Sequence, residues 1–161
     1  MIRYGIFPIK EVLSRISPHK SLFEVDGRKF FVKMGSQRYK LFDKSIVCVK
    51  CKREGNYFAL ESSDEILRWT SRLISNSGPK PHYRMHPYYI GHFNLYSLTS
   101  GGKEILMTKD HIVPVSRGGR NMMTNYQVMC AICNNNKGNS TGSKFPKAEK
   151  FLYDWEKGCW K

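Results

Sequence analysis

Two cysteine pairs of identical spacing constrain this chain more than any other feature of its 161 residues. Cys48 and Cys51 form one Cys-x-x-Cys, and Cys130 and Cys133 form the other. Each such motif turns two thiolates toward one ion, and two motifs supply the four soft ligands of a closed, tetrahedral Zn²⁺ site. We therefore expect the four cysteines to share one structural zinc ion, although the pairs lie far apart in the chain. The alternative is a set of independent free thiols.

Charge and composition limit the class of protein. There are 27 Lys and Arg against 13 Asp and Glu, which gives a formal net charge of +14. This excess suggests a polyanionic partner, most often nucleic acid, and the alternative is a soluble protein that is simply basic. The N-terminus lacks the apolar region of a signal peptide, and no run is long enough to span a bilayer. We therefore expect a cytoplasmic protein, where cysteines favour metal binding over disulfides.

The expected secondary structure is α+β. Apolar runs around Asp26-Gly27 predict a β-hairpin over 22–34. Short strands at 45–47 and 56–60 flank the first cysteine pair, which suggests that they pair as a zinc-knuckle hairpin. A capping box predicts a helix over 62–75. A second hairpin is expected from strands 92–98 and 104–109, and a C-terminal helix over 146–156. We expect a β-rich extension over 1–44 and a zinc-containing domain over 45–161 with its core at about 92–140. Residues 28–40 of the extension interleave basic and aromatic side chains, which suits either a DNA-contacting element or a core hairpin with a basic outer face.

A second metal site is suggested where the second hairpin ends, at Asp110-His111. Adjacent strand residues point to opposite faces, so one side chain would hold an ion while the other addresses a water molecule. A carboxylate and an amide oxygen suit Mg²⁺, and a neutral histidine accepts a proton from water. From these residues alone, a structural histidine is the better interpretation.

Three segments taken together, "DHIVPVSRGG", "TNYQVMC" and "CAICNNNKGN", resemble the HNH endonuclease superfamily over about residues 92–140. The resemblance implies a ββα-metal core with a four-cysteine zinc site, to which this chain adds an N-terminal hairpin and a C-terminal helix. It makes His111 the general base, Asp110 and Asn134 the ligands of the catalytic ion, and Asn125 the residue that holds the loop by hydrogen bonds. Asn136 is the second candidate for the amide ligand. The same resemblance gives Cys48, Cys51, Cys130 and Cys133 to zinc.

The function implied by this resemblance is metal-dependent hydrolysis of double-stranded DNA with Mg²⁺ or Mn²⁺, by a monomer or homodimer of phage or mobile-element type in a bacterial cell. Arg117, Arg120, Lys137 and Lys144 surround the expected site and would contact phosphates, although basic residues also serve solubility. Two other readings stay open. One is a non-catalytic zinc-ribbon module that binds nucleic acid, and the other is a degenerate nuclease fold that binds protein.

Overall fold

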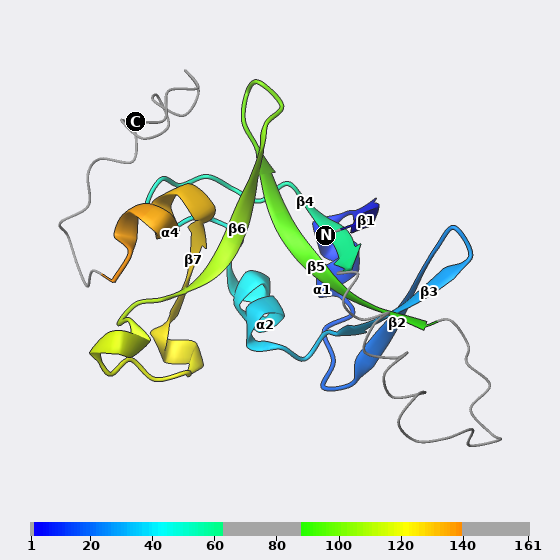
Figure 1. Cartoon of the computed structure of the whole chain (residues 1–161), viewed down its shortest axis with the longest axis horizontal. Helices are drawn as coiled ribbons and strands as arrows, with labels where there is room; N and C mark the ends of the chain where they lie inside the picture. Colours follow the sequence, from blue (N-terminus) through cyan, green and yellow to red (C-terminus); the bar gives the residue numbers. More distant parts are fainter. Residues whose placement is uncertain (1, 63–87, 140–161) are drawn as a thin grey trace, which may run out of the picture. The chain divides into compact units, whose positions relative to one another are not determined.

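The computed structural model describes residues 2–62 and 88–139, and it has the α+β character expected from the sequence (Figure 1). The chain forms two compact units. The first takes its described residues from 1–36 and 58–94, and the second takes them from 37–57 and from 95 onward. Residues 37–44, which precede the expected boundary, lie in the second unit, and the described residues 58–62 and 88–94, which follow it, lie in the first.

The first unit is built around a sheet with the strand order β1-β4-β5-β3-β2. Its elements are β1 (Ile2–Phe7), α1 (Ile9–Leu13), β2 (Lys20–Val25), β3 (Arg28–Lys33), β4 (Tyr57–Ser62) and the first part of β5 (Tyr88–Leu98). Strand β1 is antiparallel to β4, whereas β3 is parallel to β5. The core contains edge-to-face rings, with Phe23 and Phe93 centred 4.7 Å apart and Phe7 5.2 Å from Phe93.

The N-terminal hairpin predicted over 22–34 is present as β2 and β3. The two central turn residues, Asp26 and Gly27, both have positive φ, at 49° and 72°. This is the backbone of a two-residue turn whose twist matches that of the flanking strands. Phe23 pairs with Phe30 on the buried face, which fixes the register and leaves the alternate residues on the other face.

The second unit contains the region that the sequence analysis singled out. Its elements are α2 (Gln37–Lys44), the last residues of β5, β6 (Glu104–His111), β7 (Tyr126–Cys130) and α4 (Ala131–Lys137). Strands β5 and β6 form the predicted second hairpin, and β6 also pairs antiparallel with β7. Helix α4 follows β7 directly and packs against both β6 and β7 (Figure 1). The result is a β-β-α unit whose strand β7 was not predicted.

Two predicted features differ from the structure or lie outside it. The strands expected at 45–47 and 56–60 do not pair with each other. A single bridge from Val47 to Glu54 closes the cysteine loop, and β4 instead pairs with β1, because Phe58, Ala59 and Leu60 are buried in the first unit. Ser62, the first residue of the helix expected at 62–75, is the last residue of β4, and the rest of that helix lies outside the described residues, as does the helix expected at 146–156. In the part of the chain that is described, none of the helices has the length and apolar character to cross a membrane.

Candidate functional site

The first cysteine pair lies on a tight loop between α2 and β4 that is attached to β7. Within the loop, the Cys48 amide donates to the Arg53 carbonyl at 2.8 Å, and the Lys52 amide donates to the Cys48 carbonyl at 3.0 Å. The Val49 amide donates to the Val128 carbonyl at 2.9 Å. Because Val128 is two residues before Cys130, this bond holds the first pair beside the second.

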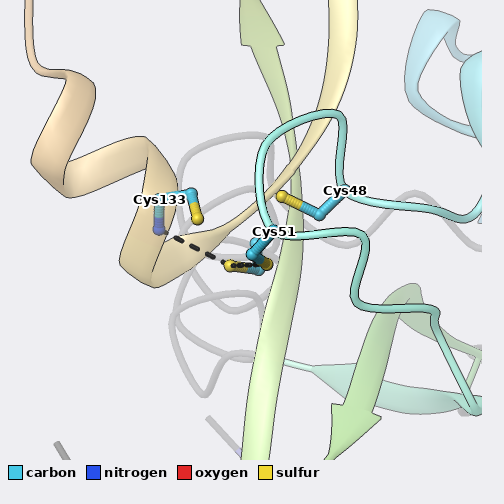
Figure 2. A group of neighbouring side chains, drawn as sticks. Cys48, Cys51 and Cys133 are labelled. Carbon is cyan, nitrogen blue, oxygen red and sulfur yellow. Dashed lines mark hydrogen bonds between the residues drawn. The ribbon is translucent and has the colours of Figure 1, made fainter. Parts of the chain in front are cut away.

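The four cysteines converge although the two pairs lie far apart in sequence. Figure 2 shows the loop carrying Cys48 and Cys51 facing Cys133 of α4. All four Sγ atoms lie within 4.8 Å of one another, and those of Cys51 and Cys130 are 3.7 Å apart. A disulfide would need about 2.05 Å. Two ligands in a tetrahedral zinc-thiolate site with Zn–S of about 2.3 Å lie about 3.8 Å apart. The four cysteines are therefore positioned to form a metal site.

The electrostatics of this cluster favour a bound cation. Hydrogen bonding to Cys130 lowers the pKa of the Cys48 thiol and lowers that of Cys51 to about 6. Hydrogen bonding to Cys130 raises the pKa of Cys133 instead. Close sulfur atoms thus share protons, since four adjacent negative charges repel one another in a largely buried site. A divalent cation would compensate this repulsion and allow all four groups to bind as thiolates.

A polar seam joins β6 to α4. Thr108 and Asp110 point to the same face of β6 because they are two residues apart, and Asn134 and Lys137 share one face of α4 because they are three apart. Asn134 Nδ2 donates to Thr108 Oγ1 at 3.0 Å, and Lys137 Nζ lies 2.6 Å from Asp110 Oδ2. The two residues expected to bind the catalytic ion therefore lie along the same seam.

Asp110 is held by two donors that reach the same oxygen. Its Oδ2 accepts from Lys137 Nζ and, at 2.8 Å, from Gln127 Nε2, so both donors occupy one side of the carboxylate. Lys137 also donates to the backbone carbonyl of His111. Among the described residues, no hydrogen bond reaches Oδ1 of Asp110. This oxygen is the one that remains for a cation.

The buried position of Lys137 does not fit the phosphate contact expected for it. Its side chain is only 3% exposed, and its ammonium group is bound to Asp110. Burial of a lysine requires such a partner, because an unpaired ammonium group in the interior is strongly unfavourable. Lys137 therefore fixes the end of β6 against α4 rather than facing DNA.

The amide of Asn134 is oriented by its neighbours. Thr108 Oγ1 donates to the Met129 carbonyl at 2.8 Å, so the hydroxyl acts as an acceptor toward Asn134, whose NH₂ group must face it. The carbonyl Oδ1 of Asn134 is left as the acceptor that a hard cation would use. Asn136 is two positions further, about 200° around the helix, so it does not share this face.

His111 points to the opposite face of β6 from Asp110, as the strand alternation predicts. Its Nε2 lies 2.8 Å from Asn121 Oδ1, and its ring meets that of Tyr126 edge-to-face at 4.9 Å between centroids. The Tyr126 hydroxyl donates to the same Asn121 oxygen at 3.3 Å. Because a carbonyl oxygen only accepts, Nε2 of the neutral ring carries the proton and Nδ1 keeps a lone pair. Nδ1 of His111 is thus the ring nitrogen that can accept a hydrogen bond.

Asn121 was not singled out from the sequence. It lies ten residues after His111 in a polar loop, and neither its spacing nor its neighbours indicate which of several asparagines would reach the histidine. Only the path of the loop from 112 to 125 brings Asn121 back to the end of β6.

Asn125 holds this loop closed. Its Oδ1 accepts from the Val113 amide at 2.9 Å, and its Nδ2 donates to the carbonyls of Val113 and Arg120, both at 3.0 Å. The loop needs two glycines. Gly118 has a φ of 82°, and a Cβ on Gly119 would lie only 1.8 Å from the Val113 oxygen.

The basic residues expected to contact DNA lie in different settings. Arg117 and Arg120 are exposed on the loop that Asn125 closes. Lys144 lies outside the described residues. The exposed loop arginines are therefore the members of the predicted set that remain as candidates for phosphate contacts in the described structure.

Comparison with known proteins gives one match. Residues 100–149 match the family model described as HNH endonuclease. The matched segment begins in the β5–β6 turn and includes β6, the loop closed by Asn125, β7 and α4. No curated protein and no solved structure matches the chain. The family match supports nuclease activity in general, with DNA as the implied substrate. Residues 100–149 are therefore similar to the HNH endonuclease family, and the four-cysteine cluster fits the zinc-bound type of that family.

Proposed function

We propose that this protein is a divalent-metal-dependent endonuclease that hydrolyses phosphodiester bonds in double-stranded DNA, with His111 as its general base. The observation that carries this proposal is the end of β6, where a carboxylate and an imidazole occupy opposite faces. The Asp110 carboxylate is held in the seam to α4, and the His111 imidazole is oriented by Asn121. The seam provides oxygen ligands, whereas the other face provides a proton acceptor.

His111 accepts the proton of the attacking water at Nδ1. Asn121 accepts the Nε2 proton and so maintains the tautomer that this step needs. When Nδ1 takes up a proton, the Asn121 oxygen stabilises the imidazolium through the same hydrogen bond. General-base catalysis by a positioned side chain contributes about 10²- to 10⁴-fold in rate.

Asp110 and Asn134 hold the catalytic ion, Mg²⁺ or Mn²⁺, through oxygen atoms. Their donor set fits such an ion, because the hydrogen bonds described above leave Oδ1 of each side chain as the remaining acceptor. When bound, the ion supplies charge that stabilises the phosphoryl and leaving oxygens. Lys137 and Gln127 keep the Asp110 carboxylate in place, and Thr108 orients the Asn134 amide.

The four cysteines bind zinc in a structural role. Four protein ligands close a tetrahedral site and leave no position for substrate. Cys130 ends β7 and Cys133 lies in the first turn of α4, so the ion fixes the start of the helix that carries Asn134. Small displacements of catalytic groups reduce rates strongly, which explains why a metal would be used to fix so short a helix.

Arg117 and Arg120 contact the DNA backbone beside the site. Both are exposed, and Asn125 holds their loop closed through its hydrogen bonds to Val113. A non-catalytic zinc module would also explain the cysteines and the charge. It would not require an oriented histidine, or an asparagine amide turned by Thr108.

The metal requirement can be tested with supercoiled plasmid. The zinc-loaded protein is incubated with Mg²⁺, with Mn²⁺ or without added divalent ion, and its zinc content is measured before and after each reaction. We expect nicked or linear product only with an added ion, at constant zinc content. Failure to cleave with either ion, by folded protein that keeps its zinc and binds DNA, would favour the non-catalytic module.

A further inference from the structure

The hairpin of the first unit carries a second surface suited to nucleic acid. Residues of β2 and β3 that alternate with the buried ones point to a common outer face, and Ile90 of β5 is the partner of Phe31 in that face. We call this surface the hairpin platform, and its members are Lys20, Leu22, Lys29, Phe31, Lys33 and Ile90. They belong to the first unit, whereas the nuclease residues belong to the second.

The platform is arranged in rows across the strands. Lys20 pairs with Lys33 in the first row, and the second row joins Leu22, Phe31 and Ile90. The third row pairs Glu24 with Lys29. An apolar row thus lies between lysines, with neighbouring strands about 4.8 Å apart.

The apolar row is accessible to solvent. Leu22 is 42% exposed and Ile90 is 43% exposed, whereas the ring of Phe31 between them is half-buried. Lys20, Lys29 and Lys33 are exposed as well. Single exposed apolar residues are common on protein surfaces, but a row of three beside lysines offers both apolar contact and positive charge.

We propose that the hairpin platform binds an unpaired nucleic-acid strand. The faces of unpaired bases pack on apolar and aromatic side chains, and basic side chains beside them contact the phosphates. In a duplex the faces of the bases are stacked on one another, and the protein meets phosphates and base edges instead. The apolar row therefore favours the single strand, while the lysines alone would serve either form.

The charge of the platform disfavours a second copy of the chain as the occupant. Three lysines and one glutamate share this face, so two copies meeting through it would bring like charges together. A polyanion is attracted by the same charges. This surface would add a second contact with nucleic acid, apart from the site of cleavage, and its existence does not depend on the nuclease activity.

The test uses full-length protein carrying His111→Ala, so that bound strands are not cut. Binding of a labelled oligothymidylate of about 20 nucleotides, longer than the roughly 4–16 nucleotides that one binding fold covers, is compared with binding of a duplex of equal length. Anisotropy titrations are repeated over a range of salt concentrations, and thermal unfolding verifies that each variant is folded.

Two double variants separate the apolar row from the charges. Leu22→Gln with Ile90→Gln should weaken single-strand binding about tenfold, because base packing is lost, while duplex binding stays within about twofold. Lys20→Gln with Lys33→Gln should lower the slope of log affinity against log salt by about 1.4 for the single strand, at about 0.7 per phosphate contact. Lys40→Gln with Lys44→Gln, on exposed positions of α2, is the matched control and should leave the slope unchanged.

The proposal is overturned if the parent does not bind the oligothymidylate, or if the apolar variant binds it as tightly as the parent or loses duplex binding equally. It is also overturned if the α2 control lowers the salt slope as much as the platform variant. Plasmid cleavage is measured separately with the same substitutions and His111 restored. Cleavage without single-strand binding would reject the platform alone, and single-strand binding without cleavage would reject the nuclease alone.

Discussion

At the scale of single residues, Asn121 has the most specific contact with the proposed base. Its amide oxygen accepts hydrogen bonds from Nε2 of His111 and from the hydroxyl of Tyr126. Asn121 is exposed, so its truncation creates no cavity. A substitution there should therefore affect catalysis without affecting folding.

Asn121→Ala should lower kcat about 10- to 100-fold with little change in KM, since a hydrogen bond to a charged group contributes about 1.5–3 kcal/mol. Asn121→Asp keeps an acceptor for Nε2 and should recover part of the rate. The control is Asn135→Ala, which changes an exposed asparagine of α4. Equal rates for parent and Asn121→Ala, measured under saturating DNA, would remove Asn121 from the mechanism.

The buried ion pair between Lys137 and Asp110 should contribute to the stability of the fold. Lys137→Met leaves the Asp110 carboxylate buried without its counter-ion, and breaking a buried ion pair in this way costs about 3–5 kcal/mol. Urea unfolding should therefore show a clear loss of stability, whereas Lys40→Met at an exposed position should show almost none. Lys137→Met combined with Asp110→Asn should recover stability, because the uncompensated charge is removed. A midpoint unchanged from the parent would show that the ion pair does not hold β6 to α4.

The residue types of this site could be predicted from the sequence, but their contacts could not. The resemblance to the family pattern singled out Asp110, His111, Asn125 and Asn134, because the motif spacing is local, and their roles stay predictions. Asn121 and Thr108 act through side-chain orientation, which depends on the path of a loop and on the packing of α4. Lys137 was assigned to DNA because it lies near the expected site in the sequence, and only the packed structure shows its burial.

At the scale of elements, the loop from 112 to 125 depends on a glycine that has no room for a side chain. A Cβ on Gly119 would lie 1.8 Å from the Val113 carbonyl oxygen and 2.9 Å from Asn125 Nδ2. The loop would have to open, and the Asn125 hydrogen bonds that close it would be lost.

Gly119→Ala should therefore reduce cleavage strongly while the rest of the fold is kept, with a stability cost of about 1–3 kcal/mol, typical of overpacking. Gly101→Ala is the matched control, because the nearest atom to its added Cβ is 3.9 Å away. Cleavage rate and unfolding midpoint are measured for both variants. Parent-like cleavage by Gly119→Ala would mean that the loop conformation does not control the site.

The cysteine loop, β7 and α4 should depend on zinc together. Cys51→Ser should lower the zinc content below one ion per chain and destabilise the second unit, because structural zinc contributes about 10–16 kcal/mol of apparent binding free energy near pH 7. Cys159→Ser changes the cysteine outside both pairs and should keep one zinc ion. Zinc is quantified by mass spectrometry of the metal, with unfolding followed in parallel. Full zinc content in Cys51→Ser would contradict a shared four-cysteine site.

Elements with strong local sequence signals could be predicted, and elements without them could not. Both hairpins could be predicted, because Asp26-Gly27 and the Gly-rich turn after β5 are strong turn signals. The strand expected at 56–60 was assigned to the wrong partner strand, because an apolar run can indicate a strand but does not indicate which strand it pairs with. Strand β7 was not predicted, because it has only five residues and four of them are buried, so its sequence has no clear alternation.

At the scale of the whole molecule, the positive charge agrees with a nucleic-acid partner but does not locate the contacts. Of the basic residues assigned to DNA from the sequence, Lys137 is buried, whereas Arg117 and Arg120 are exposed in the second unit. The division into two units could not be predicted from the sequence either. Strand β4 pairs with β1 and β5 pairs with β3 of the N-terminal hairpin, and such pairings between distant residues have no local signal.

The central claim is that His111 is the base of a metal-dependent nuclease, and one rate comparison tests it most directly. Supercoiled plasmid is incubated with Mg²⁺ and zinc-loaded parent, His111→Ala or His19→Ala, the last an exposed histidine of the first unit. We expect His111→Ala to cleave about 10²- to 10⁴-fold more slowly with unchanged zinc content and DNA affinity, and His19→Ala to match the parent. Cleavage by His111→Ala at the parental rate would contradict the account.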